Sequence, residues 1–120
     1  MHSFHNRYKD KKLIVGVGSA LIDILAHEDE IFLSKTGAVK GGMIYVNKEF
    51  IDETLLLTSR PPSLVSGGSA CNTVIGIGKL GGAARFVGKC GSGAMGEFFE
   101  NDLKRQNVEA GLETKPPNII

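Results

Sequence analysis

The segment that most constrains this chain is residues 67–72, Gly-Gly-Ser-Ala-Cys-Asn, which is followed at longer spacing by Gly81 and Gly91. A pair of glycines leaves backbone N–H groups uncovered, so a ligand can approach the main chain closely. The residues after the pair predict a helix, and a helix N-terminus adds unpaired N–H donors and a partial positive charge. Asn72, one turn inside that helix, adds an amide that both donates and accepts hydrogen bonds. These groups suit a polyhydroxylated ligand better than a metal ion.

Apolar strands alternate with helices along much of the chain, which is typical of a parallel sheet with crossover helices. The β-branched run 13–17 predicts a strand that is buried on both faces. Gly81 and Gly82 suit the C-terminus of the helix that precedes them. We expect further strands at 19–26, 63–66, 84–89 and 110–115, and helices at 69–80 and 94–106.

The stretch between residues 27 and 62 has a different pattern. A solvated turn at 27–30 leads into a short helical turn at 31–35, and residues 42–46 alternate in a way that predicts a strand. Asn47 is a good N-cap for a helix over 48–57, because its side chain can accept a hydrogen bond from a free N–H of the first turn.

Composition and charge exclude several classes of function. The chain has 120 residues, 42% of them hydrophobic, and a formal net charge of +1. That charge argues against nucleic acid as a partner, since nucleic-acid binding needs a basic face. No apolar run reaches the roughly 20 residues that a membrane span requires. Residues 1–12 are polar and basic, unlike a signal peptide, and are expected to form a disordered tail.

Cysteine and histidine usage points to a cytoplasmic protein without a metal site. Cys71 and Cys90 lie in apolar surroundings and form no CxxC motif, so we expect two reduced, buried thiols. The three histidines make no plausible set of metal ligands. Lys79, Arg85 and Lys104 are interpreted as solvated surface residues.

A GxGxxG pattern at 76–81 is not interpreted as a dinucleotide-binding motif. Such a motif needs a strand before its first glycine and a helix that opens at it. Here the glycines fall in the second half of a predicted helix, and no acidic residue follows at a strand end about 20 residues later. Close packing of the helix against the sheet is the simpler explanation for Gly76 and Gly78.

Asp23 lies among apolar residues in Leu-Ile-Asp-Ile-Leu, and two explanations for it stand side by side. A carboxylate in such surroundings must be hydrogen-bonded if it is buried. It can accept N–H groups of a turn, or it can accept two hydroxyl protons from one sugar. Asn72 poses the same choice between a structural and a ligand-binding amide, and the glycine pair before it favours a ligand.

The segment from Gly67 to Gly91 resembles the N-terminal signature of the PfkB, or ribokinase-like, carbohydrate and nucleoside kinases. Gly67, Gly68, Asn72, Gly81 and Gly91 fall at the spacings of that signature. One position departs from it, because Val74 stands where the family usually has Ser, Thr or Ala. The resemblance extends over about residues 13–117. The opening Gly18-x-x-x-x-Asp23 and the segment 39–43 look most like the adenosine kinase branch.

The resemblance implies the N-terminal part of a three-layer α/β/α fold with a small β-sheet lid. It assigns sugar hydroxyls to Asp23 and the rest of the substrate ring to Gly67, Gly68 and Asn72. Ser19 stands where adenosine kinases often carry an asparagine, and its hydroxyl could keep part of that hydrogen bonding. Met43 is a candidate for the lid over the substrate, with a place in the core as the alternative.

Catalysis in this family rests on a late Gly-Ala-Gly-Asp motif, which residues 1–120 lack. Gly91-Ser92-Gly93-Ala94 comes nearest but has no aspartate. We therefore expect the catalytic base, together with most of the ATP and Mg²⁺ site, in a C-terminal half that is absent here, and we expect residues 1–120 alone to be inactive. The lid could also mediate a homodimer.

The parent protein would transfer a phosphoryl group from ATP to a hydroxyl of a nucleoside, adenosine-like, or of a sugar. Two alternatives remain at this stage. Within the family, the protein could be a fructokinase or ribokinase. Outside it, the chain could be a non-catalytic α/β module that binds a metabolite or a partner.

Overall fold

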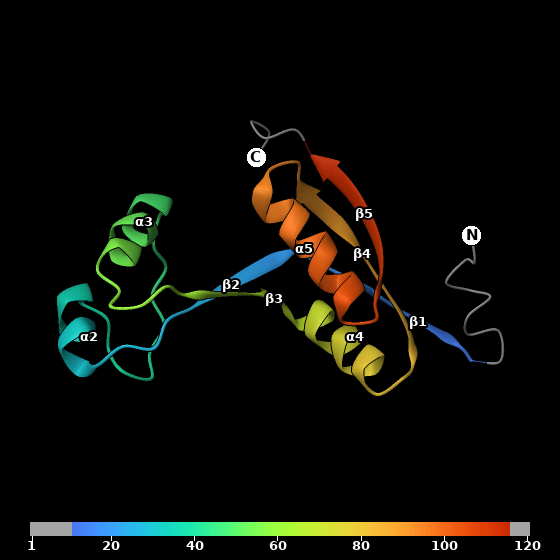
Figure 1. The fold of residues 1–120 in the computed structure, drawn as a ribbon, viewed down its shortest axis with the longest axis horizontal. Coiled ribbons are helices and arrows are strands. Elements are labelled where there is room, and N and C mark those ends of the chain that lie inside the picture. Colours follow the sequence, from blue (N-terminus) through green and yellow to red (C-terminus); the bar gives the residue numbers. More distant parts are fainter. Residues whose placement is uncertain (1–10, 116–120) are drawn as a thin grey trace. The chain divides into compact units, whose positions relative to one another are not determined.

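The computed structural model describes residues 11–115 (Figure 1). The chain forms two compact units, one from residues up to Asp23 and from Val65 onward, the other from Ile24–Leu64. Most of the tail expected at 1–12, and the chain break expected at Pro116 and Pro117, lie outside the described residues.

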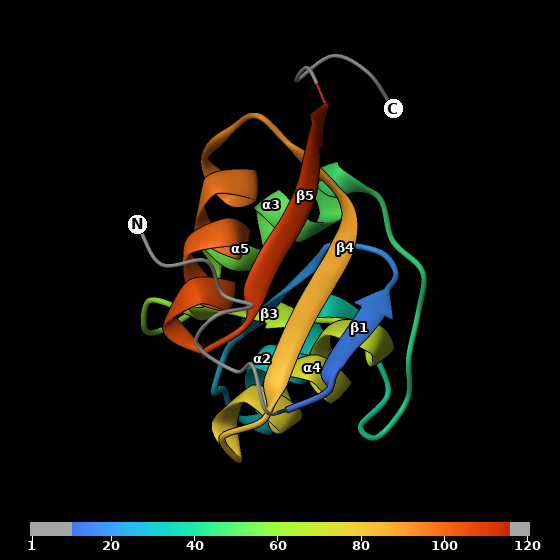
Figure 2. The ribbon, with the colours of Figure 1, turned by 90° about the vertical axis from the view of Figure 1, so that its right-hand side faces the viewer.

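The first unit contains a three-stranded parallel sheet of β1 (Leu13–Val17), β4 (Ala83–Gly91) and β5 (Glu109–Lys115). Their order is β1-β4-β5, with Leu13 opposite Ala83 and Arg85 opposite Glu109. Figure 2 shows the three strands side by side. The predicted parallel sheet is therefore confirmed, and its strands begin within one residue of where the sequence placed them.

Two helices lie on one face of this sheet, α4 (Ser69–Lys79) and α5 (Ala94–Arg105) (Figures 1 and 2). The Phe86 ring of β4 packs edge to face on the Phe99 ring of α5, with centroids 5.4 Å apart. These rings sit in a contiguous core that also contains Cys71, Val74, Ala84, Leu103 and Val108. The fold is thus a mixed α/β arrangement whose core lies between the sheet and the helices.

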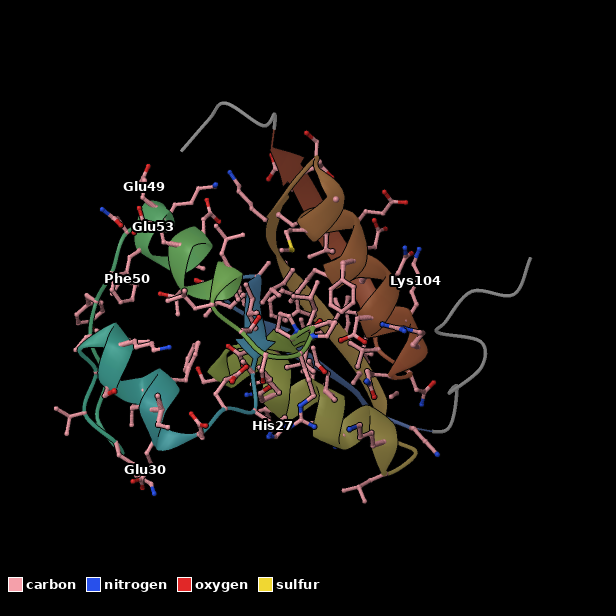
Figure 3. The ribbon with its side chains drawn as sticks, turned by 60° about the vertical axis from the view of Figure 1, so that its left-hand side comes forward. His27, Glu30, Glu49, Phe50, Glu53 and Lys104 are labelled. Atoms are coloured by element: carbon pink, nitrogen blue, oxygen red, sulfur yellow. The ribbon has the colours of Figure 1, made fainter. Side chains whose placement is uncertain are left out.

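The opposite face of the sheet carries charges between β4 and β5. Arg85 Nη2 lies 2.8 Å from a carboxylate oxygen of Glu109, and Lys89 Nζ lies 3.6 Å from one of Glu113. Each pair is directly opposite in the strand register. Arg85 is therefore a half-buried cross-strand partner, and its interpretation as a solvated residue was wrong. Lys104, in contrast, points outward from α5 (Figure 3), as predicted.

The expectation that β1 is buried on both faces is also wrong for the described residues. Val15 is 46% exposed and Val17 is 72% exposed. β1 is the edge strand of the three-stranded sheet, and α4 and α5 cover only one face of that sheet. Its β-branched composition indicated a strand correctly, but burial depends on what packs against the strand.

β2 (Leu21–Leu25) and β3 (Ser63–Gly67) form a separate two-stranded sheet, and the boundary between the two units runs through both strands. β2 is shorter than the expected 19–26. In the second unit, α2 (Glu30–Thr36) is a full short helix where a single turn was expected. α3 (Lys48–Leu56) begins as predicted, because the Asn47 side chain accepts a hydrogen bond of 2.9 Å from the Phe50 N–H.

Residues 42–46 are not a strand, which corrects the prediction from their alternation. Met43 is 80% exposed and Tyr45 is 95% exposed. An alternating segment becomes a strand only when a neighbouring strand takes its backbone hydrogen bonds. No such pairing is present for this segment within residues 11–115.

Candidate functional site

Asp23 and Gly67 lie against each other in the first unit. Asp23 is the central residue of β2, and Gly67 is the last residue of β3. A Cβ atom on Gly67 would lie only 2.7 Å from the carboxyl carbon of Asp23. Real Cβ atoms do not approach so closely, so the carboxylate occupies the space that any side chain at position 67 would need. Gly67 is buried, whereas Asp23 keeps part of its surface exposed.

Gly68 turns the chain from β3 into α4. Its φ of +96° lies in a region that other residues rarely adopt. A Cβ there would also lie 3.4 Å from the Ser19 carbonyl oxygen and 3.4 Å from Leu21 Cδ1. Gly68 is the N-cap of α4, and no side chain caps that helix. The turn therefore leaves backbone N–H groups and the positive end of an 11-residue helix beside Asp23.

Two glycines of the first strand and the turn after it bring this region against α4. A Cβ on Gly16 would lie 2.7 Å from Val74 Cγ1, and one on Gly18 would lie 3.0 Å from the Ala70 Cβ. Sequence reasoning assigned no packing role to either glycine. Their lack of side chains allows β1 and the turn after it to lie close to the first two turns of α4.

The remaining predicted site residues are less closely gathered. Ser19 and Asn72 are exposed, with Ser19 in the turn before β2 and Asn72 in the first turns of α4. Ser19 approaches Gly68 through its backbone carbonyl. Met43 belongs to the second unit and is highly exposed, which excludes the core position that was its alternative. The structure therefore brings Asp23 into direct contact with Gly67, while Gly68 follows Gly67 in the chain and lies against the Ser19 backbone.

Gly76, Gly78 and Gly81 lie in α4 or just after it, and their surroundings differ. Gly81 has φ +87° just after α4, as expected at a helix C-terminus. A Cβ on Gly78 would lie 2.7 Å from the carbonyl oxygens of Gln106 and Asn107, so close packing is confirmed there, although against the turn after α5 and not the sheet. Around Gly76 a Cβ would meet nothing within 4 Å, so the packing explanation is wrong for that residue. Both glycines lie inside α4, which excludes a dinucleotide-binding turn at 76–81.

Sequence reasoning missed Asp102, a carboxylate just beneath this region. Asp102 is 6% exposed and accepts a hydrogen bond of 3.3 Å from the N–H of Ser66, the residue before Gly67. The available signal was its helical spacing, because Asp102 follows Phe99 by three residues and so falls on the apolar side of α5.

Cys71 lies in the same core. It is fully buried, and burial, with a smaller contribution from the charge of Asp102, raises the pKa of its thiol to about 11. Both cysteines are buried and unpaired, as predicted. Such a protonated, enclosed thiol is a packing group and not a nucleophile.

Two kinds of feature are absent from the described residues, a cluster of metal ligands and a membrane-spanning helix. Within residues 11–115, no group of three or more His, Cys, Asp or Glu side chains is arranged to hold a metal. None of the helices described for this chain is long and apolar enough to span a bilayer. What the site does present is a carboxylate, a bare glycine turn and a helix N-terminus, an arrangement able to bind a hydroxylated molecule.

A family comparison agrees with this chemistry. The model of the pfkB family of carbohydrate kinases matches residues 11–116. The chain belongs to this family. The resemblance inferred from Gly67, Gly68, Asn72, Gly81 and Gly91 is thereby confirmed, and membership makes the fold ribokinase-like.

Solved and curated relatives of this pfkB-family chain include both adenosine kinases and fructokinases. The adenosine kinase from Sinorhizobium meliloti is 35% identical, with a TM-score of 0.70 over 88% of this chain and 31% of that one. The fructokinase from Xylella fastidiosa is 27% identical, with a TM-score of 0.56 over 88% and 26%. Fructokinase-2 from Zea mays is 46% identical over 44 residues, which are 37% of this chain and 13% of that protein.

The chain therefore spans about a third of the length of the solved kinases that it matches. Kinases of this family are phosphotransferases and use ATP. A second structure of the Xylella fastidiosa fructokinase, 26% identical to this chain, contains bound ATP.

Proposed function

We propose that residues 11–115 form the acceptor-binding part of an ATP-dependent kinase that phosphorylates a hydroxyl of a nucleoside or a sugar. The observation that carries this proposal is the contact between Asp23 and Gly67 at the start of α4. A polar ligand placed there would meet a carboxylate, uncovered backbone and a helix N-terminus at once.

Each part of this arrangement has a distinct task toward a polyol. The Asp23 carboxylate has two oxygens that accept hydrogen bonds, so it can hold two neighbouring hydroxyls of one ring. Gly67 and Gly68 carry no side chains that would keep the ring from the backbone. Asn72, exposed near the start of α4, can complete the polar contacts with its amide. Binding of this kind fixes the orientation of the attacking hydroxyl, which phosphoryl transfer depends on.

An adenosine-like nucleoside is the acceptor that we favour. The Sinorhizobium meliloti adenosine kinase resembles this chain more closely, in identity and TM-score, than the Xylella fastidiosa fructokinase does. The Gly-Gly-Ser at 67–69 and the spacing from Gly18 to Asp23 point the same way. The Zea mays match favours a sugar such as fructose as the alternative, and Ser19 in place of asparagine is consistent with it.

The phosphoryl-transfer machinery would come from sequence outside residues 11–115. The described residues hold no cluster of metal ligands for Mg²⁺ and no counterpart of the family's Gly-Ala-Gly-Asp motif. When bound, ATP with Mg²⁺ would supply the phosphoryl group and neutralise its charge. This chain's own share is to bind and orient the acceptor. We place the protein in the cytoplasm, where its two unpaired, buried cysteines would stay reduced, and we keep the lid as a candidate homodimer contact.

The test is a panel of acceptors offered to the full-length protein that carries this chain. ATP consumption is measured with adenosine, inosine, ribose and fructose, each with and without Mg²⁺. The proposal predicts acceptor-dependent turnover that falls steeply in an Asp23→Ala variant. A Glu113→Ala variant, altered at an exposed ion pair between β4 and β5, serves as the control and is expected to keep wild-type kinetics.

Fructose preferred strongly over adenosine would overturn the choice of nucleoside and leave the kinase proposal standing. Binding of an acceptor in a thermal-shift assay, without any ATP consumption, would favour the non-catalytic metabolite-binding module instead.

A further inference from the structure

Asp102 is a buried carboxylate on the core-facing side of α5. It is 6% exposed and lies between Phe99 and Leu103 in a helix whose other buried residues are apolar or glycine. A charge in such a place is costly unless hydrogen bonds compensate it. Alanine or leucine would fill this position without the free-energy cost of burying a charge. The role of Asp102 is therefore sought in the contacts of its carboxylate.

The two oxygens of Asp102 have different partners. Oδ2 accepts the hydrogen bond from the Ser66 N–H, and Oδ1 accepts one of 2.9 Å from Arg105 Nη2. Burial by itself would raise the pKa of this carboxyl. Hydrogen bonds from Ser66 and Gln106 and the positive charge of Arg105 outweigh burial and hold the pKa below its ordinary value. Asp102 is therefore an anion at neutral pH.

The partner on Oδ2 is the backbone of the segment that leads into the candidate site. Ser66 is buried in β3 directly before Gly67 and Gly68. Its hydroxyl lies near the carboxylate but makes no well-formed hydrogen bond, so the N–H is the defined contact. Two consecutive glycines have more conformational freedom than any other pair, and a fixed peptide immediately before them limits that freedom.

We propose that Asp102 is a positioning residue, which fixes the Ser66 peptide so that Gly67 stays against Asp23 and the site is formed before the acceptor binds. This inference rests on the proposed acceptor site. The contact is made by α5, 36 residues away in sequence, and it reaches the backbone from the side of the core. Asp102 thus acts through the main chain of β3 and does not touch the acceptor.

Variants at Asp102 and at Arg105 separate the two contacts of the carboxylate. In the full-length protein, Asp102→Ala removes both contacts, and Asp102→Asn keeps an amide oxygen that can still accept from the Ser66 N–H. Arg105→Met removes the Oδ1 contact and leaves the Oδ2 contact in place. KM and kcat are measured with adenosine and ATP, or with fructose and ATP if wild type does not use adenosine. The amide resonances of Ser66, Gly67 and Gly68 are recorded without any ligand.

We expect Asp102→Ala to raise the acceptor KM by about tenfold or more, because a hydrogen bond to a charged group is lost. Its KM for ATP should stay within about twofold of wild type, and the three amide resonances should move. Asp102→Asn should recover most of the acceptor KM. Arg105→Met should lower thermal stability, because the buried Asp102 charge loses a partner. It should leave the acceptor KM within about threefold, since the Oδ2 contact with the Ser66 N–H stays in place.

Equal changes in the KM values for acceptor and ATP would overturn the inference, and so would an acceptor KM in Arg105→Met as high as in Asp102→Ala. If wild type phosphorylates none of the acceptors, the proposed function fails. The amide resonances of Ser66, Gly67 and Gly68 then test by themselves whether Asp102 positions this segment. Resonances that move in Asp102→Ala but not in Arg105→Met support it, and unchanged Gly67 and Gly68 resonances in Asp102→Ala contradict it.

Discussion

The carboxylate of Asp23 occupies the space beside the α-carbon of Gly67 where a side chain would begin. A Cβ there would lie 2.7 Å from the carboxyl carbon and 2.9 Å from Oδ1. The two residues are 44 positions apart in the sequence and belong to different strands. The signature glycine Gly67 and the proposed acceptor-binding residue Asp23 are thus in direct contact, and each depends on the packing of the other.

We expect Gly67→Ala to weaken acceptor binding in the full-length protein. It should lower stability by about 1 kcal/mol, the low end of the usual cost of overpacking, because the Asp23 carboxylate ends an exposed side chain. The added methyl group must displace the Asp23 carboxylate or the β3 backbone. Urea unfolding and steady-state kinetics measure the two effects. The double variant Gly67→Ala/Asp23→Ala should regain stability, because the carboxylate is gone, without regaining activity. A single variant with wild-type stability and KM would contradict the arrangement described here.

Asp23→Ala and Asn72→Ala are each expected to lower kcat/KM for phosphorylation strongly, with only a modest loss of stability. Both side chains are exposed, so their removal leaves no cavity in the core. A hydrogen bond to a charged group contributes about 1.5–3 kcal/mol, which corresponds to a roughly ten- to hundredfold loss of kcat/KM for Asp23→Ala. Thr73→Ala, at an exposed neighbouring position of α4, is the control. Near wild-type kcat/KM in both site variants would show that the acceptor binds elsewhere.

Two glycines of α4 should respond in opposite ways to the same substitution. A methyl group on Gly78 would lie 2.7 Å from two carbonyl oxygens of the turn after α5, whereas one on Gly76 would meet nothing within 4 Å. Gly76→Ala is therefore expected to stabilise the protein by about 0.5–1 kcal/mol through helix propensity. Gly78→Ala should destabilise it by about 1–3 kcal/mol. Thermal unfolding of the two variants checks the difference, and equal effects would argue against this packing of α4.

Several elements of both units could be predicted from sequence because their signals are local. The run Leu13–Val17 became a strand, Asn47 became an N-cap, and the helix after Gly68 begins where the glycine pair placed it. In each case the information lies within a few residues, in side-chain branching, capping chemistry or backbone freedom.

The errors concern properties that only tertiary contacts decide. Residues 42–46 alternate like a strand but have no partner strand in the described part of the chain. Arg85 was predicted to be solvated, but β5 places Glu109 opposite it and the two form an ion pair. The role of Asp102 depends on a backbone N–H of β3, which carries no side-chain signal in the sequence. The contact of Asp23 with Gly67 likewise required the pairing of β2 and β3.

The thiol of Cys71 predicts a loss of stability at alkaline pH. Its pKa rises from 9.0 to about 11 on folding, so the folded state holds the proton more tightly than the unfolded state. This stabilisation is complete below pH 9 and is lost as the pH rises toward 11. A shift of this size corresponds to about 2–3 kcal/mol. Since lysines and tyrosines also titrate there, the measurement is the difference between wild type and Cys71→Ala in urea unfolding from pH 8 to pH 11.

That difference should shrink steadily above pH 9. Native protein should also react slowly at Cys71 with iodoacetamide at pH 8, since the thiolate is scarce and enclosed. A pH-independent difference, or rapid alkylation of Cys71 without unfolding, would contradict the burial described here.

The last prediction is that residues 1–120 by themselves catalyse no phosphoryl transfer. The reaction needs a base near the attacking oxygen and donors around the phosphate. Residues 11–115 present candidates for acceptor contacts but no cluster of metal ligands. The isolated chain should also associate, because the edge strand β1 exposes Val15 and Val17 and, among the described residues, no helix covers one face of the sheet. Size-exclusion chromatography over a range of concentrations tests the association.

For activity, purified 1–120 is assayed for ATP consumption with a mixed pool of nucleosides and sugars, beside the full-length protein as the positive control. Acceptor-dependent turnover well above a protein-free blank would refute the division of labour proposed here, since it would mean that residues 1–120 carry a base and a nucleotide site of their own.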